Sequence, residues 1–228
     1  MSAPVRVAPS ILSADIGHLA DEVEQVAAAG ADWIHVDIVD GHFAPFLSFG
    51  PATVAALRKV TRLPLDVHLM VQNPDAHIES FAKAGADILT VHPTATPDLA
   101  ATLDAIHALG ARAGVAVAPD EAVELVAPVV GKLDVILALC VRPGRSGQSF
   151  LDGQLERIAQ LAAYAERSGR RIDLEVDGGI SVDTAGPAVR AGARVLVAGS
   201  KVFGRSDRSR AIEELRTAAT DALEEENA

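Results

Sequence analysis

The sequence predicts an α/β protein folded as a single (β/α)8 barrel. Short, continuously apolar runs alternate with longer Ala-rich amphipathic stretches over the whole chain, which predicts parallel strands covered by helices on both faces of a sheet. The phrase Ala-Gly-Ala starts at residues 29, 84 and 191, intervals near two and four units of about 27 residues. In each case the Gly is placed to end a helix just before a strand. Eight units fill residues 1–228 as one domain, whereas a doubly wound open sheet usually stops at about five or six strands.

The strands and helices follow from this alternation, in chain order. The expected strands are the short apolar runs Val5–Ile11, Trp33–Ile38, Leu65–Met70, Ile88–Val91, Arg112–Val117, Val135–Cys140, Ile172–Val176 and Val195–Ala198. The expected helices are the amphipathic stretches near Leu19–Ala29, Pro51–Val60, Pro74–Ala84, Asp98–Leu109, Glu121–Val129, Leu155–Arg167, Thr184–Ala191 and Ser209–Leu223. A frayed acidic tail is expected over Glu224–Ala228.

Composition and charge argue against some classes of partner and against a secreted or membrane-spanning chain. The net charge of −11 argues against a nucleic acid or an anionic membrane as the main partner, although a few backbone N–H groups can still bind a phosphate. Cys140 is alone, so no intrachain disulfide forms. Met1–Ser10 contains no apolar signal region, and no apolar run approaches the roughly 20 residues that span a bilayer. We expect a cytoplasmic protein, and a homo-oligomer of unspecified size.

Polar side chains gather where a parallel barrel has its active site, at the carboxyl ends of the strands. Because side chains alternate along a strand, one face of three strands is polar: His35 and Asp37, Asp66 and His68, Glu175 and Asp177. Buried charges need compensation worth several kcal/mol each. A single divalent cation held by two imidazoles and two carboxylates supplies it, with Zn²⁺ the first choice and Fe²⁺, Mn²⁺ or Co²⁺ as alternatives. A polar network without a metal is the other interpretation.

Glycine-rich turns after the last two strands indicate a phosphate site. Asp177-Gly178-Gly179 follows the seventh strand and Ala198-Gly199-Ser200 follows the eighth. Barrels often bind phosphate with these two loops, although glycine also serves ordinary tight turns. The loop Arg142-Pro143-Gly144-Arg145-Ser146-Gly147-Gln148 is longer than a plain connection needs. It indicates a lid over the mouth, and a solvated surface loop is the other interpretation.

With these residues in view, the chain resembles the ribulose-phosphate 3-epimerase family over its full length. No single phrase is decisive, but their order and spacing are specific together. The matching phrases are Pro9-Ser10-Ile11-Leu12-Ser13-Ala14-Asp15, His35-Val36-Asp37, Asp40-Gly41-His42-Phe43, Asp66-Val67-His68-Leu69-Met70, Gly147-Gln148-Ser149-Phe150, Glu175-Val176-Asp177-Gly178-Gly179-Ile180 and Ala198-Gly199-Ser200. The resemblance implies a metal-dependent isomerase of the pentose phosphate pathway, which interconverts D-ribulose 5-phosphate and D-xylulose 5-phosphate through a cis-enediolate.

The resemblance also implies residue roles. The implied metal ligands are His35, Asp37, His68 and Asp177, and Asp37 and Asp177 are the implied acid–base pair. Inverting C3 needs one group to take a proton and another to return one on the opposite face, which suits aspartates from two opposite strands. Together with the glycine loops, the expected substrate-binding residues are Ser10, His68, Gly144, Arg145, Ser146, Gly147, Asp177, Gly178, Gly179, Gly199 and Ser200.

Departures from the family pattern leave the sugar open. They are Val39 and Leu139 in place of Met, Phe46 in place of Asn, Cys140 in place of Thr, Arg142 in place of Asn, and Arg145-Ser146 in place of Phe-Gly. The alternatives are a 3-epimerase of another ketose phosphate, such as allulose 6-phosphate, and a non-catalytic sugar-phosphate-binding barrel. Related decarboxylating and aldol barrels carry a Lys in an Asp-x-Lys-x-x-Asp strand, and Asp37-Ile38-Val39-Asp40 has none.

The other histidines are expected outside the site. His18, His42, His77 and His107 fall in predicted loops or helices, where surface or capping positions are common. His92, at the end of the fourth strand, is within reach of the mouth but is not assigned to it.

Overall fold

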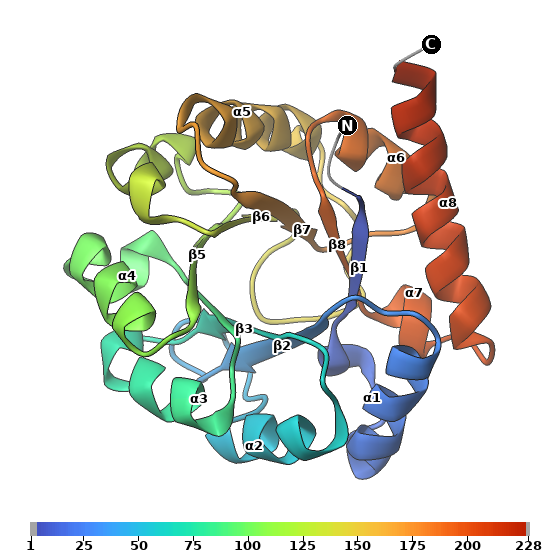
Figure 1. The fold of residues 1–228 in the computed structure, drawn as a ribbon, viewed down its shortest axis with the longest axis horizontal. Helices are drawn as coiled ribbons and strands as arrows, with labels where there is room; N and C mark the ends of the chain where they lie inside the picture. The colour runs from blue at the N-terminus through green and yellow to red at the C-terminus, as the bar shows by residue number, and fades with distance from the viewer. Residues whose placement is uncertain (1–3, 227–228) are drawn as a thin grey trace.

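Eight parallel strands form one sheet that closes almost completely into a barrel (Figure 1). A computed structural model describes residues 4–226. The sheet order is β1-β8-β7-β6-β5-β4-β3-β2, and the first and last of these strands meet at a single bridge between Ser10 and His35. The strands are β1 (Arg6–Pro9), β2 (Ile34–Val39), β3 (Leu65–Met70), β4 (Ile88–Val91), β5 (Arg112–Val117), β6 (Val135–Leu139), β7 (Asp173–Asp177) and β8 (Val195–Ala198).

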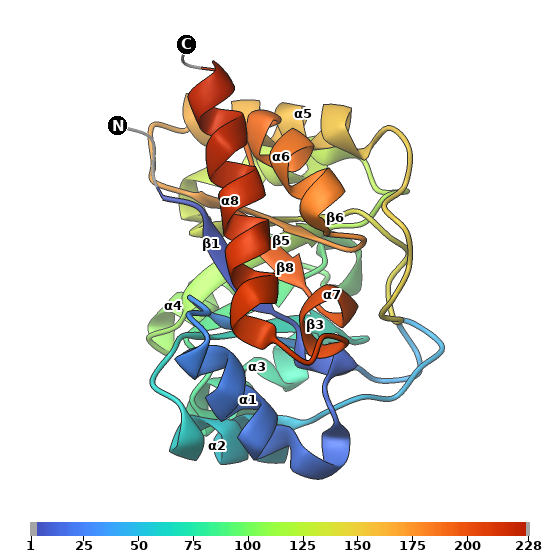
Figure 2. The ribbon, with the colours of Figure 1, turned by 90° about the vertical axis from the view of Figure 1, so that its right-hand side faces the viewer.

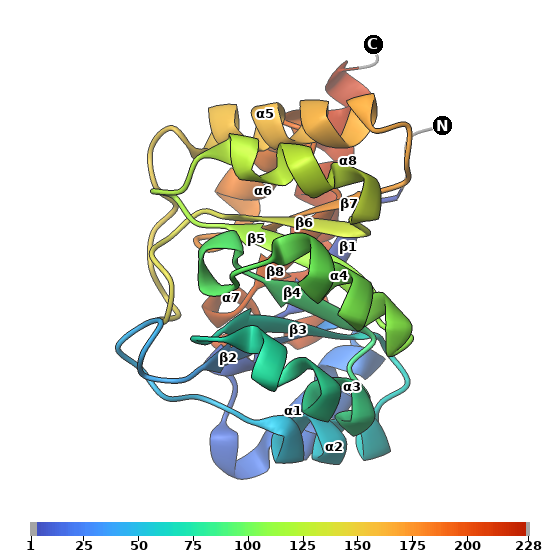
Figure 3. The same ribbon diagram turned by 90° about the vertical axis from the view of Figure 1, so that its left-hand side faces the viewer.

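The helices pack around the outside of the strands, as the three ribbon views show (Figures 1, 2 and 3). The α-helices are α1 (Leu19–Ala28), α2 (Pro51–Val60), α3 (Ile78–Ala84), α4 (Leu99–Ala108), α5 (Gln154–Arg167), α6 (Val182–Arg190), α7 (Ser200–Phe203) and α8 (Arg208–Glu226). Five 3₁₀ segments lie between them: η1 (Ile11–Ser13), η2 (Ile16–His18), η3 (Pro74–Ala76), η4 (Pro93–Ala95) and η5 (Val123–Lys132). Across the described part of the chain, every helix is too short or too polar to cross a bilayer.

The predicted barrel is confirmed, and four strands have the predicted bounds: β3, β4, β5 and β8. The Ala-Gly-Ala prediction is confirmed as well. Gly30, Gly85 and Gly192 follow the ends of α1, α3 and α6 with φ of 93°, 104° and 114°, a left-handed conformation that an L side chain rarely adopts. These turns bring the chain directly into the next strand.

Three predicted segments differ from the structure in more than the position of their ends. The helix expected near residues 121–129 is the 3₁₀ helix η5 rather than an α-helix. Pro128 lies inside η5 and removes one α-helical hydrogen bond, although α6 remains α-helical around Pro187. The helix expected over residues 74–84 is interrupted at His77, between η3 and α3. The tail expected from residue 224 belongs to α8 as far as Glu226, and residues 227–228 lie outside the described chain.

Strand side chains alternate between two environments. In β2, Ile34, Val36 and Ile38 pack in the apolar layer between sheet and helices, so His35 and Asp37 point to the barrel interior. This alternation is the predicted one, and it follows from the two-residue period of a strand.

The amino-terminal end of the barrel is closed by Trp33, which is 5% exposed and packs with Val135 and Val195. The guanidinium groups of Arg6 and Arg112 lie 5.3 and 5.4 Å from the centre of the indole ring. Access to the polar interior therefore comes from the other end. There the loops after β2 and β6 lie on the same side of the barrel (Figures 2 and 3).

Candidate active site

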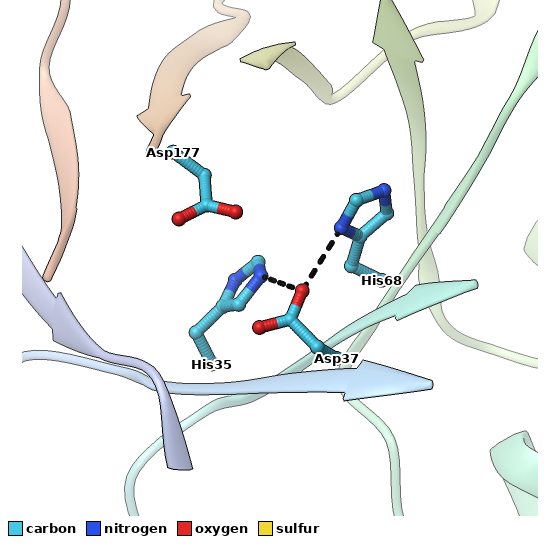
Figure 4. Close-up of side chains that lie close together, drawn as sticks. All are labelled: His35, Asp37, His68 and Asp177. Atoms are coloured by element: carbon cyan, nitrogen blue, oxygen red, sulfur yellow. Dashed lines mark hydrogen bonds and ion pairs between the residues drawn. The ribbon is translucent and has the colours of Figure 1, made fainter. Parts of the chain in front are cut away.

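Four polar side chains converge inside the carboxyl end of the barrel (Figure 4). One ligand atom from each of His35, Asp37, His68 and Asp177 lies within 4.8 Å of the others. Asp37 Oδ1 lies 3.3 Å from His35 Nε2 and 3.2 Å from His68 Nδ1. The Asp177 carboxylate faces this group from β7 (Figure 4). The structure thus brings together the four residues that the family resemblance implies as metal ligands.

Strand register explains this convergence. Asp37 on β2 is the direct neighbour of His68 on β3, and Ser10, which follows β1, forms a bridge with His35. The Ser10 hydroxyl donates a 2.7 Å hydrogen bond to Asp37 Oδ2. A hydroxyl held on one carboxylate oxygen leaves the other oxygen, Oδ1, facing the two imidazoles.

Burial and the charges of neighbouring groups shift the pKa values of Asp37, Asp177 and His68 in different directions. Burial would raise the pKa of Asp37, but the His35 and His68 imidazoles hold it well below its usual range. Burial and the nearby Asp37 charge raise the pKa of Asp177 to about 7. Burial lowers the pKa of His68 to about 4, against the effect of its bond to Asp37. Two carboxyl groups with such different proton affinities are typical of an acid–base pair.

Two further buried carboxyl groups, those of Asp66 and Glu175, lie against His35. The Nδ1 atom of His35 lies 2.6 Å from Asp66 Oδ2 and 3.4 Å from Glu175 Oε1. Burial, followed by the Asp66 charge, raises the pKa of Glu175 well above its usual range. These three residues form a second cluster that could also hold a cation, but His35 has only two ring nitrogens and turns Nε2 toward Asp37. The sequence pattern correctly directed Asp66 and Glu175 inward without showing that both reach the same imidazole.

His92 is the functional candidate that the sequence did not assign. It is fully buried, and its Nε2 lies 2.9 Å from His68 Nε2. Its position at the end of β4 was the available signal, because the inward side chains at strand ends meet at the same mouth. The other histidines lie elsewhere, as predicted: His18 pairs with Asp15 at an exposed turn and His107 with Asp134.

A cavity of about 420 Å³ opens above the four-residue cluster. Asp37 and Asp177 line it, whereas His35 and His68 are buried beneath it. The structure therefore does not place His68 in the cavity wall, where a substrate contact was expected. The other expected substrate-binding residues do line it: Ser10, Gly144, Arg145, Ser146, Gly147, Asp177, Gly178, Gly179, Gly199 and Ser200.

The glycines of the cavity wall permit close approach of neighbouring chain. A Cβ on Gly179, at φ 69°, would come within 2.1 Å of the backbone nitrogen of Phe150, at the end of the β6 loop. A Cβ on Gly199 would come within 2.5 Å of Ser13 Oγ. Side chains at these positions would push the β6 and β1 loops outward. Both glycines therefore set the width of the cavity.

The loop after β6 forms the outer wall of the cavity. Gln148 holds it by donating hydrogen bonds to the carbonyls of Arg142 and Arg145, at 2.7 and 2.8 Å. Gly144 packs against Ala44 of the β2 loop, where an added Cβ would come within 2.7 Å of the Ala44 Cβ. Arg142 and Arg145 are exposed side chains that line the cavity, as Lys201 of α7 does, so three positive groups border a site that is also rich in carboxylates.

The residues that depart from the family pattern divide into two groups. Leu139 and Ser146 line the cavity, as Arg142 and Arg145 do, whereas Val39 packs beside Met70 and Ala44 in a small apolar cluster. Phe46 is 42% exposed and Cys140 is fully buried, and neither lines the cavity. Only the first group is therefore placed to contact a ligand in this cavity directly.

The donor set fits a divalent cation. Two imidazole nitrogens and two carboxylates within 4.8 Å of one another are the number and kind of ligand that Zn²⁺ and similar ions take. The Asp37 oxygen between two imidazole nitrogens marks a point where three acceptors can meet one positive ion.

Known proteins resemble this chain in sequence and in fold. Residues 6–203 match the model of the ribulose-phosphate 3 epimerase family. The ribulose-phosphate 3-epimerase of Bacillus subtilis is 47% identical over 213 residues, which cover 93% of this chain and 98% of that protein. The chloroplastic ribulose-5-phosphate-3-epimerase of Arabidopsis thaliana is 43% identical over 95% of this chain and 78% of its own. Among solved structures, 3-keto-L-gulonate-6-phosphate decarboxylase from Vibrio cholerae has the same fold, with a TM-score of 0.70 at 15% identity over 98% of this chain and 99% of its own.

Proposed function

The chain belongs to the ribulose-phosphate 3-epimerase family, whose named members are isomerases, and we propose that it inverts C3 of ribulose 5-phosphate by two-base proton transfer. Asp37 and Asp177 are the proposed bases, and His35, Asp37, His68 and Asp177 the proposed holders of one divalent ion. The observation that carries the proposal is the position of the two aspartates. They are the members of the four-residue cluster that line the cavity, and they come from β2 and β7, on different sides of the barrel.

This placement suits inversion at a carbon atom. A substrate lying between β2 and β7 presents one face of C3 to Asp37 and the other face to Asp177. One carboxylate removes the C3 proton while the other, as a carboxylic acid, delivers a proton to the opposite face. A bound divalent ion would supply positive charge to stabilise the negative charge that develops on the C2 and C3 oxygens.

Ser10 keeps Asp37 in place for this step. Its hydroxyl donates to Oδ2 at 2.7 Å, so the carboxylate cannot rotate freely within the site. A hydrogen bond to a charged group contributes about 1.5–3 kcal/mol. Ser10 thus orients the base as well as lining the cavity.

The remainder of the cavity is suited to the phosphate. Backbone N–H groups of the Gly178-Gly179 and Gly199-Ser200 turns can approach an anion closely because no Cβ intervenes. Arg145 lies on the β6 loop on the same cavity wall, and a guanidinium grips phosphate in two places. We propose that this loop acts as the lid over the bound substrate.

Turnover and metal content of the purified protein test the function together. With D-ribulose 5-phosphate we expect D-xylulose 5-phosphate, about one divalent metal per chain, and loss of activity on chelation. A panel of C4, C5 and C6 ketose phosphates, allulose 6-phosphate included, separates the pentose substrate from a related one. Full activity in chelator would exclude the metal proposal. If the protein binds a sugar phosphate of the panel but turns over none of them, it is a non-catalytic sugar-phosphate-binding barrel instead.

Zinc is our proposed native metal because the donors are two nitrogens and two oxygens. The role in the pentose phosphate pathway, the cytoplasmic location and the homo-oligomeric state remain predictions. Elemental analysis of protein purified without added metal, cell fractionation and analytical ultracentrifugation check them in turn.

A further inference from the structure

A chain of buried contacts runs from His68 away from the proposed metal site. His68 Nδ1 faces Asp37 Oδ1 at 3.2 Å, and its other nitrogen, Nε2, meets His92 Nε2 at 2.9 Å. His92 in turn directs Nδ1 at Glu121 Oε2, at 3.4 Å. Both imidazoles are fully buried, so bulk water does not reach either ring. Phe43 packs on the His92 ring with a centroid distance of 4.6 Å, which limits rotation of that ring.

The outer end of this chain is built as a hydrogen-bond acceptor. Glu121 Oε1 accepts from the Thr94 hydroxyl at 2.6 Å, and Oε2 accepts from the Ala118 N–H at 2.7 Å. Burial would raise the pKa of Glu121, but its bonds from His92, Thr94 and Ala118 lower it. As an ionised carboxylate, Glu121 therefore accepts a hydrogen bond from His92 Nδ1–H and has no proton to donate.

The direction of every bond then follows by counting protons. A neutral His92 that donates from Nδ1 to Glu121 has a bare Nε2. Across 2.9 Å, the partner nitrogen of His68 must carry the proton, because two bare nitrogens would repel. A neutral His68 with its proton on Nε2 has a bare Nδ1, which is the nitrogen that faces Asp37.

We propose that Glu121 and His92 are positioning residues that present the bare Nδ1 of His68 to the metal ion. The proposal rests on the proposed function, because it assumes that a metal occupies the four-residue cluster. Neither Glu121 nor His92 lines the cavity that Asp37 and Asp177 line, so both act through His68.

His35 shows why such control is needed. It faces the same Asp37 oxygen with Nε2, at 3.3 Å, while its Nδ1 is bound to Asp66 at 2.6 Å. The two histidines thus turn opposite nitrogens to one point. In a free neutral imidazole the proton can sit on either ring nitrogen, so the ring alone does not select which nitrogen faces the metal ion. Each ring therefore has its own buried partner: Asp66 for His35, and His92 with Glu121 for His68. Such partners fix the tautomer and orientation of metal-binding histidines.

Two substitutions of His92 separate positioning from packing. His92→Phe keeps a flat ring but removes the acceptor for His68 Nε2–H, whereas His92→Gln supplies an amide oxygen in its place. We expect the Zn²⁺ dissociation constant, measured against a chromophoric chelator, to rise about 10–100-fold in His92→Phe. In His92→Gln it should stay within about threefold, because the acceptor is retained. Asp120→Asn is the matched control, since Asp120 is the exposed neighbour of Glu121 and should leave the affinity unchanged.

Nitrogen NMR of histidine-labelled, zinc-loaded wild-type protein gives a second measurement that does not depend on any variant folding. We expect His92 to carry its proton on Nδ1 and His68 to carry its proton on Nε2. A proton on His92 Nε2 would overturn the proposal. So would wild-type zinc affinity in His92→Phe, or equal losses in His92→Phe and His92→Gln at unchanged melting temperature.

Failure of the proposed function has a different signature. In that case the wild-type protein itself binds no divalent metal or does not epimerise the sugar phosphate. Failure of the positioning proposal alone leaves a wild-type enzyme that binds zinc and turns over, together with a His92→Phe variant that binds zinc equally well.

Discussion

Replacing Asp177 with Asn tests the two-base proposal most directly. The change keeps an oxygen donor at the end of β7 but removes the carboxylate that lies across the cavity from Asp37. Asn neither takes up nor releases a proton near neutral pH, so the face of C3 beside residue 177 loses its acid and its base. Asp37, held by Ser10 at 2.7 Å, can still remove a proton from its own face and return one there.

The expected loss follows from the position of the group. General acid–base catalysis contributes about 10²–10⁴-fold, which corresponds to roughly 3–5 kcal/mol of activation free energy. Burial and the Asp37 charge raise the pKa of Asp177 to about 7, close to the working pH, where such a group is most effective. We therefore expect kcat to fall toward the upper end of that range. Because a neutral amide oxygen binds a cation more weakly than the carboxylate that it replaces, zinc must be kept at saturation.

Proton NMR of the C3 signal in D2O is the assay. The wild-type enzyme should place deuterium at C3 of the product, because the proton that one carboxylate removes is not the one that the other delivers. In Asp177→Asn, one epimer should still exchange its C3 hydrogen for deuterium slowly, although it is no longer converted into the other epimer at a comparable rate. Asp183→Asn is a charge-matched control, since Asp183 is exposed on α6, lines the same cavity and lies outside the four-residue cluster.

Two results would refute the reasoning about Asp177. One is exchange of neither epimer by zinc-saturated Asp177→Asn, and the other is epimerisation at the normal rate. A loss of kcat in Asp183→Asn equal to that in Asp177→Asn would show that the charge of the cavity, rather than a placed base, controls turnover.

Four further predictions address the lid, the cavity wall, the closed end of the barrel and acid stability. Arg145→Ala should raise KM more than it lowers kcat in steady-state kinetics, if Arg145 binds ground and transition states alike; an unchanged KM would place Arg145 outside the phosphate site. Gly179→Ala should weaken binding of inorganic phosphate and raise KM, because its Cβ would lie 2.1 Å from the Phe150 nitrogen; unchanged binding, measured by calorimetry, would contradict the close packing. Trp33→Ala should lower the free energy of unfolding by about 3–5 kcal/mol in a urea titration, whereas Trp33→Phe should lower it less; equal losses would mean that indole volume is unimportant. Burial would raise the pKa of Asp40, but hydrogen bonds from the N–H groups of residues 72, 43 and 42 lower it, so its stabilising contribution is complete above its ordinary pKa and disappears as the pH falls through the lowered value. Urea titrations below about pH 4 should therefore show a steeper loss of stability with acid in the wild type than in Asp40→Ala, and parallel curves would count against it.

Local pattern was sufficient for most of the barrel. Continuous apolar runs gave the strands, since strands covered on both faces contain few polar residues, and the bounds of β3, β4, β5 and β8 were predicted without error. The failure at η5 has a local cause too. Apolar spacing over residues 121–129 favoured an α-helix, whereas Pro128 removes one α-helical hydrogen bond there, and a pattern of hydrophobicity does not register a missing N–H.

The inward direction of the polar residues was also determined by the sequence, because side chains alternate strictly along a strand. His35, Asp37, His68 and Asp177 could be directed to the mouth once their strands were known. Their assignment as one ligand set depended on resemblance to a family, and the structure then placed their ligand atoms within 4.8 Å of one another.

Only the tertiary structure decided what surrounds that set. His92 and Glu121 lie 29 positions apart, in a strand end and a turn whose meeting no local period describes. Whether a residue at the mouth lines the cavity or is buried beneath it, as His68 is, depends on how far each strand is shifted against its neighbours. Sequence period fixes the face on which a side chain lies, whereas hydrogen bonding between strands and packing between loops fix its depth and its partners.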